Sequence, residues 1–218
     1  MPDDLRDRIA GEEFDYLALL HALREYARPR DRITVLLSRG EIIRVKKGIY
    51  VFGEWHAARP FSREVMANML YGPSYLSLDW ALYHHGLIPE RPAAVTSVAC
   101  GRARRFSTPV GLFVYRELPL RSYLIGIDLA APDGGRPFLI ATPEKALADK
   151  VHDERGTALL ARYEMKAWLM EHLGIAPERL AGLDVRKLGI ISDHYGSRKV
   201  RLLHDLIRRI AVGKERMA

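Results

Sequence analysis

The fold is best approached from residues 71–92, which read Tyr-Gly-Pro-Ser-Tyr-Leu-Ser-Leu-Asp-Trp-Ala-Leu-Tyr-His-His-Gly-Leu-Ile-Pro-Glu-Arg-Pro. Ser74 is a suitable N-cap, and the apolar side chains that follow occupy nearly every side of a helix predicted over residues 75–85. Gly86 suits the left-handed position after this helix, and Pro89 prevents its continuation. Because a helix that is apolar all round is a buried one, this segment is predicted to be the core helix of the larger part of the protein.

The composition is that of an ordinary globular protein, with 48% hydrophobic and 28% charged residues in a chain of 218. That length suffices for one large domain or two small ones. No apolar run reaches the length of a membrane span, and the N-terminus does not resemble a signal peptide. We therefore expect a cytoplasmic protein with no membrane partner. The single Cys100 excludes an internal disulfide, and we expect no metal and no cofactor.

Positive charge is concentrated near the two ends of the chain, and the formal net charge is +7. Residues 28–50 contain seven Lys or Arg against two acidic residues, and residues 194–218 contain seven against two. Two such basic regions are typical of a protein that binds nucleic acid, although a solvated basic surface would show the same pattern.

The first part of the chain has the pattern of a winged helix. Residues 13–27 carry apolar side chains at helical spacing, and a second helix is predicted over residues 30–39 with Gly40 as its stop. Residues 41–53 contain two β-branched runs around Lys46-Lys47-Gly48, which predicts a β-hairpin. In a winged helix, one helix enters the major groove and the hairpin reaches backbone phosphates. The two lysines are placed for phosphate contact.

The remaining residues predict a larger mixed α/β domain that ends in helices, so the fold class is α+β. Helices are expected at residues 63–70, 157–173 and 197–212, and a further helix is expected to open at Thr142-Pro143-Glu144. Strands are expected at residues 94–100, 111–116, 125–129 and 138–141. The segment between the first two strands is interpreted as a connection that carries Arg102, Arg104 and Arg105. Pro-Asp-Gly-Gly at residues 132–135 predicts a turn. The domain boundary is placed between residues 56 and 57.

The sequence contains no strong enzymatic motif. It has no glycine-rich phosphate loop followed by Lys-Ser/Thr, no His-Glu-x-x-His and no Gly-x-Ser-x-Gly. His84 and His85 point about 100° apart on a helix and therefore do not chelate one ion together. Four charged residues are interpreted as i, i+4 surface pairs rather than as a general acid/base set: Glu144, Lys145, Asp149 and Lys150. We expect that the protein is not an enzyme and has no catalytic residue.

Three stretches carry a resemblance to a known family. The first is Leu37-Ser-Arg-Gly-Glu-Ile-Ile-Arg-Val-Lys-Lys-Gly-Ile-Tyr. The second is Ser77-Leu-Asp-Trp-Ala-Leu-Tyr-His-His-Gly-Leu-Ile-Pro followed by Val95-Thr-Ser-Val. The third is Leu139-Ile-Ala-Thr-Pro-Glu-Lys-Ala-Leu-Ala-Asp-Lys. In this order, over roughly residues 16–153, they resemble the AbiEi family, the antitoxins of type IV toxin–antitoxin systems of the AbiE abortive-infection type.

The resemblance implies two functions. The winged helix at residues 1–56 would bind inverted repeats upstream of its own operon, as paired monomers or a dimer, and repress it. The domain at residues 57–218 would counter a cognate nucleotidyltransferase-like toxin, without necessarily forming a stable complex. Carried over by position, the DNA contacts fall on Arg30, Arg32, Thr34, Ser38, Arg39, Lys46 and Lys47. Further contacts to a partner or to nucleic acid are assigned to Arg102, Arg104, Arg105, Arg201, Arg208 and Arg209.

The chain departs from the family pattern before the predicted recognition helix. Family members usually have an additional short helix there, whereas only Arg28 and Pro29 separate the two predicted helices. The additional helix is therefore either missing or supplied by residues 3–11. Three alternatives stay open: a winged-helix transcriptional regulator without a toxin partner, an antitoxin that modifies its toxin covalently, and an interaction module that has lost DNA binding.

Overall fold

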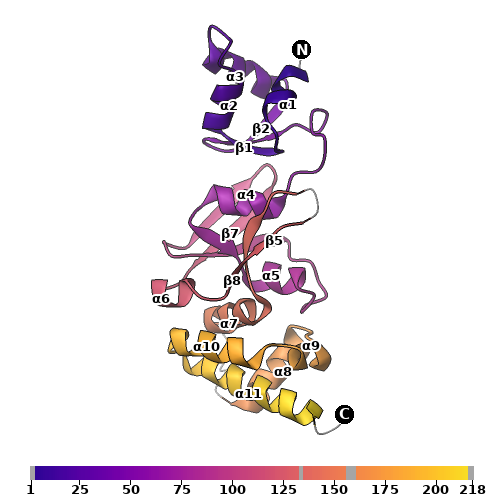
Figure 1. Cartoon of the computed structure of the whole chain (residues 1–218), viewed down its shortest axis with the longest axis vertical. Coiled ribbons are helices and arrows are strands. Elements are labelled where there is room, and N and C mark those ends of the chain that lie inside the picture. Colours follow the sequence, from indigo (N-terminus) through magenta and orange to yellow (C-terminus); the bar gives the residue numbers. More distant parts are fainter. Residues whose placement is uncertain (1–2, 133–134, 156–160, 216–218) are drawn as a thin grey trace.

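The protein is arranged in three tiers along one axis (Figure 1). The computed structural model describes residues 3–132, 135–155 and 161–215. An N-terminal unit of helices and a small sheet forms the first tier, a larger sheet with helices on it forms the second, and C-terminal helices form the third (Figure 1). The fold is thus mixed α and β, with helices at its C-terminal end.

The N-terminal unit packs three helices against a three-stranded antiparallel sheet of order β1-β3-β2. Its elements are α1 Asp3–Arg8, β1 Glu13–Asp15, α2 Tyr16–Ala22, α3 Pro29–Ser38, β2 Ile42–Lys46 and β3 Ile49–Phe52. Its own hydrophobic cluster contains Phe14, Leu19, Ile33, Leu36 and Ile42, all of them buried. The sheet closes because the β2–β3 hairpin brings β3 beside β1, which lies far upstream in the chain.

The prediction of one helix over residues 13–27 is wrong at both ends. Residues Glu13–Asp15 form strand β1, in which Glu13 pairs with Val51 of β3. The helix begins only after Asp15, whose carboxylate accepts from the Ala18 backbone N–H at 2.7 Å as an N-cap, and it ends at Ala22. Residues Asp3–Arg8 form a short helix, α1, so a helix does precede β1 within the segment 3–11.

Two glycines let the chain pass closely where the N-terminal sheet begins and ends. Gly40 ends α3 with a φ of +68°, a conformation that residues with a Cβ rarely adopt. A Cβ on Gly53 would lie 1.8 Å from the Gly40 carbonyl oxygen, so no side chain fits at this position. These contacts hold the end of α3 beside the end of β3.

The second tier is a six-stranded mixed sheet of order β6-β7-β5-β4-β9-β8. Its strands are β4 Ser74–Leu76, β5 Ala94–Ala99, β6 Arg104–Thr108, β7 Gly111–Glu117, β8 Ile127–Ala130 and β9 Phe138–Ala141. Strand β4 lies in the interior, antiparallel to β5 and parallel to β9. The connection predicted between β5 and β7 instead contains β6, which pairs with β7 as an antiparallel hairpin at the edge of the sheet.

The core helix predicted over residues 75–85 is shorter than expected. Residues Ser74–Leu76 are strand β4, and the helix α5 spans Leu78–His84. The uniformly apolar pattern has a different cause, because a strand paired on both edges and covered on both faces is also apolar all round. The predicted helix end is confirmed: Gly86 has a φ of +67°, and the Leu87 N–H donates to the Leu82 carbonyl at 2.8 Å.

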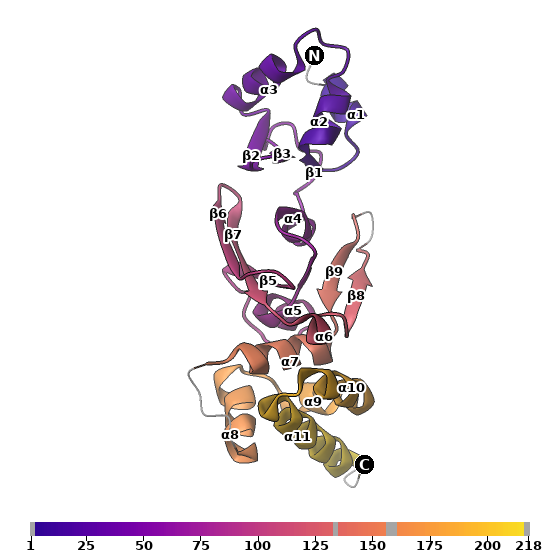
Figure 2. The same ribbon diagram turned by 90° about the vertical axis from the view of Figure 1, so that its left-hand side faces the viewer.

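Helices cover both faces of the large sheet, with α4 (Arg63–Leu70) on the side of the N-terminal unit and α5 and α7 (Pro143–Asp153) on the other (Figure 2). The remaining helices are α6 Leu120–Tyr123, α8 Arg162–Ala167, the π-helix Trp168–His172, α9 Pro177–Ala181, α10 Val185–Tyr195 and α11 Arg198–Glu215. Of the predicted helix at 157–173, residues 157–160 lie outside the described residues, as do residues 133 and 134 of the predicted turn.

The N-terminal unit is packed against the second tier rather than tethered loosely to it. Val45 and Val51, on the face of the small sheet away from its own helices, belong to the main hydrophobic cluster of the larger part. The predicted boundary at residue 56 falls in the segment between β3 and α4. Across the described ranges, no helix is both long enough and apolar enough to cross a membrane.

Candidate nucleic-acid interface and a buried charged cluster

Helix α3 presents a polar face to solvent. It begins with Pro29 at the first helical position, where the missing N–H costs no hydrogen bond. Ile33 and Leu36 are buried against the unit's own core, so the opposite side of the helix is exposed. The exposed side carries Arg30, Thr34 and Ser38, which lie one turn apart and therefore form a single stripe.

The other residues predicted on this helix differ in their surroundings. Arg39 is exposed and lies 3.7 Å from Glu41. Arg32 is half-buried, with its guanidinium 5.6 Å from the ring centre of Tyr26 and its Nε without a hydrogen-bond partner. Thr34 donates to the Arg30 carbonyl at 3.3 Å, a bond weak enough for the hydroxyl to exchange for another partner. The face thus holds two exposed guanidinium groups and two hydroxyls.

The sequence predicted that both lysines at the tip of the β2–β3 hairpin face solvent, but only one of them does. Lys47 is exposed, but Lys46 donates from Nζ to the Leu70 carbonyl at 2.8 Å and lies 4.4 Å from the ring centre of Phe106. The pairing of β2 with β3 shifts register between Arg44 and Lys46. Such a bulge changes the direction of a side chain, and here Lys46 contacts the second tier.

The remaining predicted contact residues are exposed in two separate places. Arg102, Arg104 and Arg105 lie on or before edge strand β6, whereas Arg201, Arg208 and Arg209 lie on α11 in the third tier. None of the three arginines at β6 forms an ion pair within the described part of the chain, while Arg208 lies 3.6 Å from Asp205. The structure therefore does not bring these two groups together.

A cluster of buried charged and hydroxyl groups joins the large sheet to the C-terminal helices. Asp149 on α7 accepts from Lys145 Nζ at 2.8 Å and from Ser77 Oγ at 2.6 Å. It also accepts from Tyr75 OH at 3.3 Å and, in a short hydrogen bond, from Tyr195 OH on α10. The side chains of Lys145 and Asp149 are 0% and 1% exposed. The interpretation of these two residues as a surface pair is therefore wrong.

Burial determines the acid–base behaviour of this cluster. Desolvation lowers the pKa of Lys145, and the neighbouring Asp149 carboxylate opposes that shift. Desolvation, with Asp149 adding to it, raises the pKa of Tyr75 and of Tyr195 well above the usual tyrosine range. Because Lys145 has no exposed surface, no molecule in solution reaches its amine. The arrangement cross-links β4, α7 and α10.

Sequence reasoning missed this cluster, although a signal for it was present. The neighbours of the pair on α7 are Ala146, Leu147, Ala148 and Val151, all of them 0% exposed. Apolar residues at these positions lie on every side of the helix, which indicates that the charged residues between them are also enclosed. Glu144 is likewise buried, and its Oε1 accepts from the Asp184 backbone N–H at 2.9 Å.

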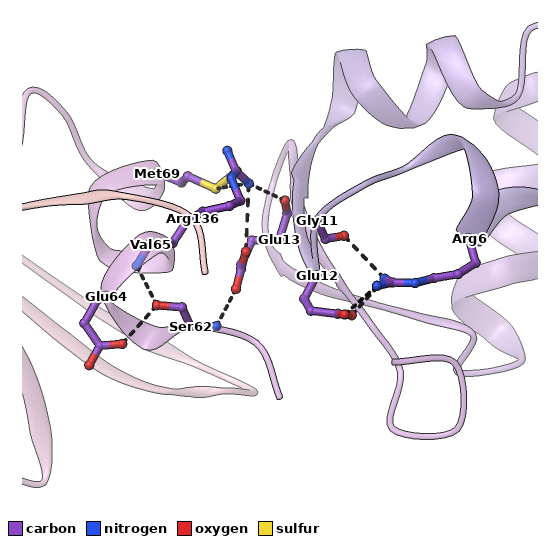
Figure 3. Close-up of polar contacts among 9 residues, drawn as sticks. All are labelled: Arg6, Gly11, Glu12, Glu13, Ser62, Glu64, Val65, Met69 and Arg136. Carbon is purple, nitrogen blue, oxygen red and sulfur yellow. Dashed lines mark hydrogen bonds and ion pairs between the residues drawn. The ribbon is translucent and has the colours of Figure 1, made fainter. Parts of the chain in front are cut away.

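Two adjacent glutamates form the polar joint between the first two tiers (Figure 3). Glu12 is held within the N-terminal unit by Arg6, with N–O distances of 2.9 and 2.6 Å. Glu13 points the other way and accepts a short hydrogen bond from the backbone N–H of Ser62, the N-cap of α4. Arg136 donates to the Glu13 carbonyl at 2.7 Å and lies 3.8 Å from its carboxylate. Strand alternation explains why neighbouring carboxylates bind to different tiers.

The linker between β3 and α4, residues 53–62, lies beside this joint and carries an unusually exposed aromatic side chain. Trp55 is 93% exposed, whereas Trp80 and Trp168 are 2% and 6% exposed. The linker also forms one wall of a cavity of about 490 Å³, whose other walls include β2, β3 and Val110 of the β6–β7 turn.

No protein-family model matches the sequence, and no curated protein matches it. Within the described residues, no group of three or more His, Cys, Asp or Glu side chains is arranged to hold a metal ion.

Proposed function

We propose that residues 3–52 form a winged-helix DNA-binding unit, with α3 as the recognition helix and the β2–β3 hairpin as the wing. The observation that supports this most is the order of helix, strand, two helices and hairpin, closed by a three-stranded antiparallel sheet. The order is that of winged helices, in which the last helix lies in the major groove. The exposed stripe of Arg30, Thr34 and Ser38 is then the face that meets the bases.

Two kinds of contact are expected from this unit. Hydroxyl and guanidinium groups on α3 are suited to base edges, and Lys47 at the hairpin tip is suited to a phosphate. Lys46 is left out of the proposed interface because its amine contacts Leu70 and Phe106. Arg32 is assigned a supporting role, since it lies against Tyr26.

Gel retardation with the full chain tests this proposal. The DNA upstream of its own operon should be retarded in preference to unrelated DNA of equal length, and the affinity should fall steeply between 50 and 200 mM salt because bound phosphates release counterions. Thr34→Ala should relax sequence preference, whereas Lys47→Ala should weaken binding to all sequences alike and lower the salt slope by about 1. Lys166→Ala, which removes an exposed positive charge from α8, is the matched control. Equal binding to both DNAs would contradict the proposal.

We further propose that the larger part acts as the antitoxin of a type IV system, which would neutralise a nucleotidyltransferase-like toxin encoded beside it. The support is the order of the AbiEi-like stretches in the sequence. One of these stretches contains Glu144, Lys145 and Asp149, which are buried. Because these residues are buried, this stretch supports a fold shared with the AbiEi family, and any contact with the toxin would be made by other residues, on the surface. Co-expression tests the proposal: the adjacent gene should be toxic alone and harmless with the full chain.

A winged-helix regulator without a toxin partner is the second candidate. It is favoured by the same N-terminal unit and requires nothing of the second and third tiers. The co-expression experiment separates the two, because an adjacent gene that is not toxic leaves only the regulator.

A further inference from the structure

The cavity beside the linker has the size and the position of a small-molecule site. Its volume is about 490 Å³. Ligand pockets usually measure about 300–1,000 Å³ and lie preferentially at the junctions between domains. Strands β2 and β3 of the N-terminal unit form one wall, and the linker and the β6–β7 turn of the second tier form the others. We refer to this space as the linker cavity.

The lining of the linker cavity is mainly apolar. Large apolar side chains reach it from β2, β3, the linker and the β6–β7 turn, namely Ile43, Val51, Phe52, Phe61 and Val110. The lining residues 58–60 are exposed, so the cavity opens to water along the linker. Because apolar surface is poorly solvated, an apolar molecule that covers these side chains gains free energy by removing them from water.

The charged groups of the lining favour a neutral molecule. Glu12 is the buried charged residue among them, and Arg6 already neutralises its carboxylate through two hydrogen bonds of 2.9 and 2.6 Å (Figure 3). A charged molecule would lose hydration on entering and would gain no free counter-ion among the buried lining residues. An anion would also meet the carboxylate of Glu54, which is exposed at the opening.

Strand β2 connects the linker cavity with the proposed recognition helix. Ile43 lines the cavity, whereas the neighbouring Ile42 belongs to the hydrophobic cluster that contains Ile33 and Leu36 of α3. Successive side chains of a strand point to opposite faces, so β2 meets the cavity on one face and the core beneath α3 on the other. A molecule that changes the position of β2 therefore changes the support of α3.

We propose that the linker cavity binds a neutral, mainly apolar small molecule, and that this molecule regulates DNA binding by the N-terminal unit. The regulatory half of the inference rests on the proposed DNA-binding function, and the binding half does not. The molecule acts on the packing of β2 and β3 against the second tier, because it contacts both. The effect is reciprocal: DNA changes the affinity for the molecule by the factor by which the molecule changes the affinity for DNA.

Titration of the full chain with Nile red, a neutral apolar dye, tests the site. The dye emission should rise and saturate at one dye per chain. The anionic dye 8-anilinonaphthalene-1-sulfonate should bind at least about tenfold more weakly, because it would carry its charge into apolar surroundings. Tighter binding of the anionic dye would contradict the assignment of a neutral ligand.

Two variants in different walls of the cavity locate the bound dye. Phe61→Ala removes an apolar wall and Val110→Asp adds a carboxylate, so each should weaken Nile red binding at least about tenfold. Leu17→Ala on α2 and Val212→Asp on α11 replace exposed apolar side chains outside the cavity and are the matched controls. If one wall variant unfolds, the other decides the question. Absence of saturable binding, or equal binding by wall variants and controls, would overturn the site.

Gel retardation in the presence of saturating Nile red tests the regulatory half. The affinity for the DNA upstream of the operon should change about fivefold or more, and that DNA should change the affinity for the dye by the same factor. The DNA affinity of Val110→Asp should not respond to the dye. Dye binding that leaves the DNA affinity unchanged would overturn regulation alone. A chain that binds the dye but no DNA would overturn the proposed DNA-binding function, and regulation with it, but not the site.

Discussion

Helices α3 and α7 begin alike in sequence and end in opposite environments. Each has proline at its first helical position followed directly by charged residues. On α3 the apolar side chains occupy one face, so Arg30 and its neighbours remain in water. On α7 the apolar side chains occupy every side, and Lys145 and Asp149 are enclosed with them. The residues between the charges, more than the charges themselves, determine whether a charged pair is part of the surface or of the core.

The strongest test of this contrast is removal of the buried carboxylate. Asp149→Ala would leave the ammonium of Lys145 buried without its counter-ion, and should lower the free energy of unfolding by about 3–5 kcal/mol in urea titrations. Replacing both partners, as Lys145→Met with Asp149→Leu, should recover much of that loss because no charge is left unpaired. A loss below about 1 kcal/mol for Asp149→Ala would show that the cluster is not closed to water.

Glu13, at the joint between the first two tiers, tests whether a buried carboxylate also contributes to stability outside α7. The Glu13 side chain is 4% exposed, and its carboxylate accepts from the Ser62 backbone N–H and lies 3.8 Å from Arg136 Nη1. Glu13→Ala should cost about 1–3 kcal/mol of unfolding free energy, because it leaves the Ser62 N–H without a partner and leaves Arg136 only its hydrogen bond to the backbone carbonyl of residue 13. Glu54→Ala, which removes an exposed glutamate from the neighbouring linker, is the control and should have little effect. Equal midpoints of thermal unfolding for the two variants would contradict the role given to Glu13.

The smallest effect is expected on α3. Thr34→Ala and Arg30→Ala alter exposed side chains, so each should change the free energy of unfolding by no more than about 0.5 kcal/mol. Circular dichroism in urea measures this directly, on the same samples used for DNA retardation. A large loss of stability would mean that the face is a packing surface and would remove the basis for calling it an interface.

The local sequence predicted the elements that depend on their own residues. Helices α3, α4 and α7 and the β2–β3 hairpin were all expected, because caps, prolines and apolar spacing act within a few residues. The three-residue strands β1 and β4 were missed because each exists only through a distant partner, as Glu13 with Val51 and Ser74 with Ala99. No pattern within three residues encodes such pairing, whose cost depends on closing a long loop.

The same distinction between nearby and distant residues applies to the candidate sites. The exposed polar face of α3 follows from helical periodicity and was expected. The burial of Asp149 depends on Tyr75, Ser77 and Tyr195, which lie 74, 72 and 46 residues away along the chain. The orientation of Lys46 depends on a single irregularity in strand pairing. Residues brought together from distant segments were therefore beyond prediction from one sequence.

The position of Trp55 gives this protein a built-in optical probe. An indole surrounded by water emits at longer wavelength than one in a protein core, and aqueous iodide can collide with the exposed ring but not with Trp80 or Trp168. The three indoles sit in the linker, on α5 of the second tier and in the π-helix of the third. Quenching of the red-shifted component would thus report on anything that covers the linker, without a label and while the other two indoles serve as internal standards.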